Sequence, residues 1–162
     1  MEFDWAVFTI FLGACSAAAA TGSMFPPGRW YDALQKPSWN PPKWVFPVVW
    51  SVLYLAIAVS AARVADAPGS AMAMAFWAFQ IALNTLWTPV FFGLRRIKAG
   101  MVVIGLLWVS VLGTVVFTFQ VEPFSGLLLL PYLAWVTIAA ALNAAVWRLN
   151  PEEANTPREI EA

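Results

Sequence analysis

The chain has 162 residues, of which 61% are hydrophobic and only 11% are charged, and its mean hydropathy is +0.71. A soluble domain carries roughly a quarter charged residues, so this composition indicates an integral membrane protein. Nine basic and nine acidic residues balance without a basic tract, which argues against a nucleic-acid partner. The sequence has no histidine, which excludes histidine-dependent catalysis, histidine metal sites and a histidine haem ligand. We therefore expect no metal and no resident cofactor.

Long apolar stretches predict an all-α membrane protein with five transmembrane helices in a single bundle. A helix needs about 20 residues to cross the hydrocarbon core, and the expected spans are residues 5–24, 44–64, 71–92, 99–119 and 124–149. Together they form one domain over residues 1–150. Asn150 and Pro151 are expected to end the fifth helix, and the polar residues 151–162 are expected to form a disordered tail.

The basic residues predict how the chain is oriented in the membrane. With five spans, residues 25–43, residues 93–98 and the C-terminus share one side, which carries all the lysines and arginines except Arg63. By the positive-inside rule this side, with the C-terminus, is cytoplasmic and the N-terminus is outside. Helical spans of this kind belong in an inner-type membrane, because outer-membrane proteins are usually barrels.

The third expected span has two contrasting faces. At about 100° per residue, a narrow face of small side chains is formed by Ala71, Ala75, Ala78 and Ala82. The opposite face is polar and aromatic and is formed by Gln80, Asn84, Trp87 and Phe91. The alanine face favours close approach of another helix, and we expect it to form the interface of a homodimer.

Aromatic and polar stripes also occur on the second and fifth expected spans. Large aromatic side chains recur every four residues at Phe46, Trp50 and Tyr54. The inward stripe of the fifth span lies within about 80° and consists of Tyr132, Trp135, Ala139 and Asn143. Helix bundles place ligand sites between such stripes. Two alternatives stay open, namely an interfacial aromatic belt for Trp39 and Trp44, and hydrogen bonding between helices for Asn84 and Asn143.

A series of short motifs runs through nearly the whole chain. These motifs are KPSWNPP at residues 36–42, FPVVW at residues 46–50, Leu53-Tyr54, Gln80, Leu83-Asn84, Trp87, Phe91-Phe92, Pro131-Tyr132, Trp135 and Leu142-Asn143. They resemble the signature of the translocator protein family, also called the tryptophan-rich sensory protein or peripheral-type benzodiazepine receptor family. The resemblance extends from Trp5 to about Asn150 and is greatest to alphaproteobacterial members.

This resemblance implies a five-helix protein of the bacterial cell membrane, commonly a homodimer, that binds porphyrins such as protoporphyrin IX and lipids or sterols such as cholesterol. The implied pocket lies among the first, second, third and fifth helices, and its matching positions are Trp39, Phe46, Trp50, Tyr54, Asn84, Trp135 and Ala139. The face analysis adds Trp87, Phe91 and Asn143 as ligand-binding candidates. The family's vertebrate cholesterol motif is incomplete here, because no tyrosine lies between Leu142 and Arg148.

Three functions follow from these observations. We predict a membrane receptor, sensor or transporter that binds porphyrins, with sterols as a further ligand class. The lack of charge in mid-span disfavours an active transporter. The alternative is an enzyme that degrades porphyrin in light, with Trp50 and Trp135 as catalytic electron donors. A third hypothesis is a structural or partner-binding protein that acts through its dimer. Loss of bound porphyrin in light would distinguish the second function from the first.

Overall fold

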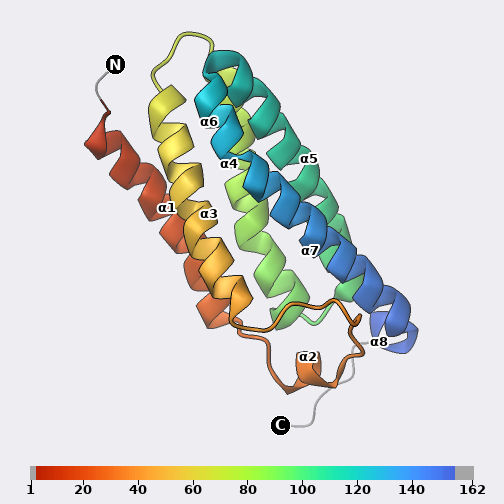
Figure 1. Ribbon diagram of the computed structural model, residues 1–162. Helices are drawn as coiled ribbons and strands as arrows, with labels where there is room; N and C mark the ends of the chain where they lie inside the picture. Colours follow the sequence, from red (N-terminus) through yellow and green to blue (C-terminus); the bar gives the residue numbers. More distant parts are fainter. Residues whose placement is uncertain (1–2, 156–162) are drawn as a thin grey trace.

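The computed structural model describes residues 3–155, and every regular element within them is a helix (Figure 1). The elements are α1 (Trp5–Met24), α2 (Arg29–Ala33), α3 (Val45–Val64), α4 (Ala71–Thr88), the π-helix η1 (Pro89–Gly93), α5 (Ile97–Val121), α6 (Pro123–Leu128), α7 (Leu130–Leu149) and α8 (Pro151–Asn155). The all-α prediction is confirmed for the described residues. The long helices begin and end close to the expected spans.

Four helical segments among the described residues are long and apolar enough to cross a membrane. They are α1, α3, α5 and the segment Pro123–Leu149, which contains α6 and α7. The 18-residue helix α4 is not among them, because Gln80, Asn84 and two tryptophans lower its hydropathy. The helices therefore make this a multi-pass membrane protein, whereas a fifth crossing by α4 stays a prediction.

The helices pack in an order that differs from their order in the chain. Helix α1 packs along α3 and also contacts α4, α4 packs along α5, and α5 packs along α7 (Figure 1). Helix α6 packs against α3. The backbones of α3 and α4 stay apart, and those of α3 and α7 approach each other only rarely. The interior between these three helices is therefore filled by side chains rather than by close backbone contact.

The two faces of α4 lie as the periodicity predicts. Gln80 and Asn84 are buried, whereas the four alanines of the opposite face are exposed on this chain, namely Ala71, Ala75, Ala78 and Ala82. Helix α4 then continues into the π-helix η1, where the N–H of Leu94 donates to the carbonyl of Pro89 at 2.8 Å. A π-turn contains more residues than an α-turn, so it changes the direction in which the following side chains point. Phe91, which is buried, lies within this π-helix.

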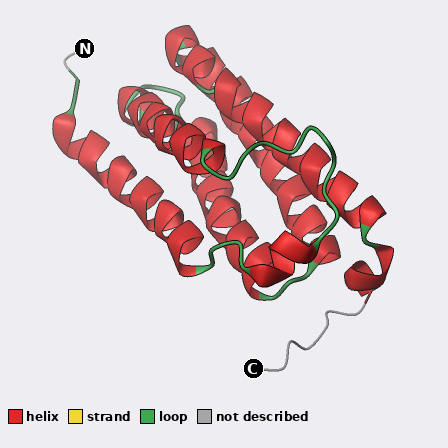
Figure 2. Cartoon of the chain, turned by 60° about the horizontal axis from the view of Figure 1, so that its bottom comes forward, coloured by secondary structure: helices red, strands yellow, loops and turns green. Residues whose placement is uncertain are grey.

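The long segment between α1 and α3 crosses one end of the bundle (Figure 2). It contains α2, whose Trp30 is buried together with Leu34 against Phe91, Ile97 and Val146. Gly100 allows this packing, because a Cβ atom there would lie 2.8 Å from the ring of Phe91. The segment is therefore attached to the bundle by an apolar cluster of its own.

The structure corrects one prediction at the C-terminal end of the chain. Residues 151–162 were expected to be disordered, but Pro151–Asn155 form the short helix α8. Proline suits the first position of a helix, and the acidic Glu152 and Glu153 suit its first turn, where the helix dipole is positive. The remaining residues of the predicted tail, 156–162, lie outside the described residues.

Candidate ligand-binding site

The aromatic stripes of α3 and α7 meet inside the bundle. Phe46 contacts Trp135 edge to face, with ring centroids 5.6 Å apart. Trp50 stacks on Tyr54 at 5.3 Å and meets the ring of Tyr132 at 6.0 Å. These side chains belong to the main hydrophobic core, against which Ala139 also packs. The structure thus brings together the aromatic residues that the sequence predicts on these two helices. The loop residue Trp39 is not part of this group.

A chain of hydrogen bonds connects the same helices to α4. The hydroxyl of Tyr54 donates to Oδ1 of Asn84 at 2.9 Å, and Nδ2 of Asn84 donates to the hydroxyl of Tyr132 at 2.9 Å. The Tyr132 hydroxyl in turn donates to Oε1 of Gln80 at 2.7 Å. Asn84 therefore hydrogen-bonds to side chains of both α3 and α7, and it still has one N–H and one oxygen lone pair to offer.

Two tryptophan side chains in this region are buried with unused donors. The indole Nε1 atoms of Trp87 and Trp135 are inaccessible to solvent and have no hydrogen-bond partner among the described residues. Buried polar groups are nearly always paired, and an unpaired one costs free energy. An acceptor atom on a bound molecule would remove this cost at either tryptophan.

Other predicted site residues lie elsewhere. Trp39 is on the loop and 52% exposed, which matches the interfacial-belt alternative better than a pocket wall. Phe91 belongs to the separate cluster around Trp30, and Trp87 contacts both clusters. Asn143 donates through Nδ2 to the main-chain carbonyl of Ile97 at 3.1 Å, so it joins α7 to α5. Hydrogen bonding between helices, the alternative kept for Asn143, is thus present.

Gln80 and Tyr132 were not among the predicted ligand-binding residues, although both lie on the predicted inward stripes. The structure places them directly beside Asn84, through the hydrogen bonds of Tyr132. The positions of Gln80 and Tyr132 on the inward faces of their helices were the sequence signal that could have identified them. What the sequence lacked was the pairing of α4 with α7, because these two residues are 52 positions apart.

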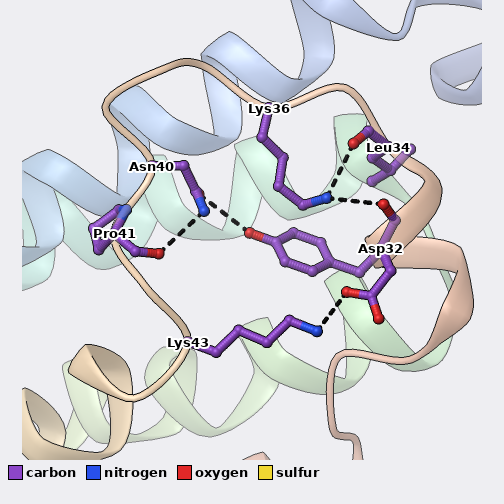
Figure 3. A network of polar contacts seen from close by, with 7 residues as sticks. Asp32, Leu34, Lys36, Asn40, Pro41 and Lys43 are labelled. Atoms are coloured by element: carbon purple, nitrogen blue, oxygen red, sulfur yellow. Dashed lines mark hydrogen bonds and ion pairs between the residues drawn. The ribbon is translucent and has the colours of Figure 1, made fainter.

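A polar network holds the loop together at the end of the bundle (Figure 3). The Lys36 ammonium donates to the main-chain carbonyls of Asp32 and Leu34, at 3.2 and 3.0 Å. Lys43 hydrogen-bonds to the exposed Asp32 carboxylate and lowers the pKa of that group, with a further contribution from the charge of Lys36. Burial, together with the Asp32 charge, raises the pKa of Tyr31, whose hydroxyl donates to Asn40 at 3.4 Å. Lys36 and Lys43 thus stabilise the conformation of the loop.

A hollow on the surface of the described residues does not coincide with the predicted pocket. It has a volume of about 430 Å³ and is lined by Trp30, Ala33, Leu34, Gln35, Leu149, Asn150, Pro151, Glu152 and Glu153. It therefore lies where α2 and the loop meet the end of α7 and α8. Between α3, α4 and α7, in contrast, the aromatic rings contact one another, as described above.

Comparison with known proteins identifies the family. A profile described as the TspO/MBR family matches residues 6–148. The chain belongs to the TspO/MBR family. It is 54% identical over 151 residues to the protein CrtK of Rhodobacter capsulatus, covering 91% of this chain and 94% of that protein. It is 49% identical over 150 residues to a tryptophan-rich sensory protein of Cereibacter sphaeroides, with coverages of 93% and 95%. It is also 39% identical over 158 residues to the translocator protein of Homo sapiens, with coverages of 93% and 94%.

These matches confirm the resemblance predicted from the sequence motifs, and they support a multi-pass membrane protein of the sensory or translocator type. The TspO/MBR match includes every predicted ligand-binding residue, from Trp39 to Asn143. It ends before Asn150, whose side chain joins the loop to the end of α7. The predicted site residues therefore lie within the family match, whereas of the two residues that attach the loop only Gln35 lies within it.

Proposed function

We propose that this TspO/MBR protein is a membrane receptor, sensor or transporter that binds porphyrins, with protoporphyrin IX as the main candidate and sterols as a second ligand class. The observation that carries the proposal is the packing of aromatic rings between α3 and α7, where Phe46 contacts Trp135 and Trp50 contacts Tyr132. The flat apolar face of a tetrapyrrole is complementary to such rings. The names of the relatives, sensory protein and translocator protein, agree with a role in recognising or moving a molecule at the membrane.

The arrangement of the backbones favours the same function. Because α3 stays apart from α4 and approaches α7 only rarely, the interior can change by movement of side chains without separating packed backbones. The rings contact one another, so a bound porphyrin must insert between them. The unpaired indole N–H groups of Trp87 and Trp135 then become donors for acceptor groups of the ligand.

The proposal includes the membrane topology and the assembly of the protein. Helix α4 also spans the membrane, as the third of five spans in chain order. The loop of residues 25–44 and the segment of residues 94–96 then face the cytoplasm and the N-terminus faces outward, as the distribution of basic residues favours. Two copies associate through the exposed alanine face of α4, because small side chains permit close approach of helices in a membrane.

Titration with protoporphyrin IX tests the proposal directly. The purified protein is titrated in detergent while the Soret absorbance band is recorded, and we expect saturable binding. Trp135→Ala should weaken binding at least about tenfold, because it removes a stacking surface and an indole donor. Trp5→Ala is the matched control, because Trp5 lies on α1 and is 71% exposed. Absence of saturable binding to the unaltered protein would leave the structural or partner-binding hypothesis ahead.

A further inference from the structure

The buried hydrogen-bond chain between α3, α4 and α7 has a direction. Each link passes from a donor to an acceptor, in the order Tyr54, Asn84, Tyr132 and Gln80. The exposed fractions of these four residues are 8%, 6%, 1% and 0%. Asn84 uses its oxygen toward Tyr54 and its nitrogen toward Tyr132, so the Tyr132 proton is directed to Gln80. Gln80 must consequently present its oxygen to Tyr132.

The chain ends in a donor that has no acceptor. With Oε1 of Gln80 occupied by Tyr132, the Nε2 atom of Gln80 is buried and has no hydrogen-bond partner among the described residues. Turning over the Gln80 amide alone would pair its nitrogen with the Tyr132 oxygen but would leave the Tyr132 proton without its acceptor in the chain. With Asn84 placed as described, the hydrogen bonds of Tyr132 therefore favour the orientation that leaves Nε2 free for a ligand.

We propose that Gln80 Nε2 is a ligand-anchoring donor, and that it recognises an uncharged oxygen acceptor, such as the carbonyl of a protonated carboxyl group or of an ester, or a hydroxyl, on the molecule bound between α3, α4 and α7. This inference rests on the proposed function and specifies a chemical group of the ligand. An uncharged oxygen fits better than a carboxylate, because no cationic side chain belongs to the hydrogen-bond chain and a buried carboxylate would remain uncompensated. Tyr132 is a positioning residue, since it holds the Gln80 amide in the orientation that presents the donor.

Two porphyrins of the same ring system provide the test. Protoporphyrin IX dimethyl ester has carbonyl acceptors and no charge, whereas octaethylporphyrin has no oxygen atom at all. The unaltered protein should bind the ester about tenfold more tightly than octaethylporphyrin, as one hydrogen bond to an otherwise unpaired buried donor permits. Gln80→Leu should reduce this preference to about twofold or less, while the affinity for octaethylporphyrin stays within about twofold.

Further variants separate recognition from a purely structural role. Gln80→Glu should keep the preference, because a carboxyl buried among apolar groups holds its proton and can accept from Tyr132 while donating to the ligand. Tyr132→Phe should lose the preference although Gln80 is present, because the amide is no longer held in place. Gln120→Leu is the control for the substitution itself, since Gln120 is exposed on α5.

The outcomes distinguish this inference from the proposed function. If neither the two test porphyrins nor protoporphyrin IX binds the unaltered protein, the proposed function fails. If the ester and octaethylporphyrin bind equally well, or if the preference persists in Gln80→Leu, the role of Gln80 is overturned and porphyrin binding stands. A preference that is lost in Gln80→Leu and in Tyr132→Phe, and kept in Gln80→Glu, supports the inference.

Discussion

Asn150, directly after α7, hydrogen-bonds to both main-chain groups of Gln35, 115 positions earlier in the sequence. Its Oδ1 accepts from the Gln35 N–H at 2.9 Å, and its Nδ2 donates to the Gln35 carbonyl at 2.9 Å. The same Nδ2 also donates to the carbonyl of Val146 at 2.8 Å. A single amide side chain thus fastens the loop to the last long helix.

The first prediction concerns this attachment. Asn150→Leu removes both inter-element hydrogen bonds, and the local free energy of opening should fall by about 1 kcal/mol. Amide hydrogen exchange at Gln35 measures this change, and it should become roughly fivefold faster. Gln35→Ala is the control. It should leave the exchange rate nearly unchanged, because only main-chain atoms of Gln35 form these hydrogen bonds. Unchanged exchange in Asn150→Leu would show that the apolar cluster around Trp30 holds the loop without help.

The second prediction concerns the crossing by α4. Asp66 precedes this helix and Leu94 follows it, and both side chains are exposed. In a Cys15→Ala background, Asp66→Cys and Leu94→Cys should react with a membrane-impermeant maleimide from opposite sides of the membrane. Ser38→Cys on the loop should react from the same side as Leu94→Cys. Reaction of Asp66→Cys and Leu94→Cys from the same side, opposite to Ser38→Cys, would mean that α4 does not span the bilayer.

The third prediction concerns self-association through the exposed alanines of α4. The double variant Ala75→Leu and Ala78→Leu adds bulk where two helices are expected to approach closely, so it should shift the protein toward monomer in detergent. Cross-linking and size-exclusion chromatography with light scattering report the change. The same substitutions at Ala134 and Ala141, which are exposed on α7, are the control. An equal effect of both double variants would place the interface elsewhere.

The fourth prediction separates binding from photochemistry. Trp135→Phe retains most of the stacking area and should weaken porphyrin binding by only about 1 kcal/mol. Tryptophan is oxidised much more easily than phenylalanine, so an enzyme that uses Trp135 as an electron donor should nearly lose light-driven porphyrin degradation in this variant. Samples with equal bound protoporphyrin IX are illuminated and the decay of the Soret band is compared. Equal decay rates would remove Trp135 from any catalytic role.

The fifth prediction concerns pH and the contact between the end of α3 and α6. The Arg63 guanidinium donates to Glu122, and this bond, with another from Ser125, lowers the pKa of Glu122 below its ordinary 4.5. Because the pKa is lowered on folding, the stabilisation is present above about pH 4.5 and is lost as the pH falls through the folded value. Glu122→Gln should cost at most about 1 kcal/mol at pH 7, since the pair is partly exposed.

Thermal unfolding of the two proteins in detergent checks this sign. The unaltered protein should lose stability between pH 6 and pH 3 relative to Glu122→Gln, and the two curves should converge at the acidic end. Glu153→Gln is the control, because this carboxylate lies on α8 and does not pair with Arg63. A difference between the first two proteins that grows toward low pH would contradict the assignment.

Features that repeat along a helix could be predicted from the sequence, and features that depend on distant pairing could not. The buried position of Asn84 and the exposed alanines of α4 follow from a period of 3.6 residues, which needs no knowledge of neighbours. The bond from Asn150 to Gln35 has no local pattern, because it joins opposite ends of the chain. Trp39 matched a family motif, but a motif does not state how exposed a side chain is. Helix α8 was missed because the polar composition after Asn150 was interpreted as disorder, although Pro151 is a favourable first residue of a helix.

The separation of α3 from α4 has a consequence for how the chain is made. Successive long helices usually pair as they leave the ribosome, and α1 with α3, α4 with α5 and α5 with α7 are such pairs. Helix α4, however, packs on α1 and not on α3, although a short turn joins it to α3. The inward faces of α3 and α4 can be enclosed only when α6 and α7 have entered the membrane. The buried polar side chains of α4, Gln80 and Asn84, are therefore among the last groups to be enclosed during biogenesis.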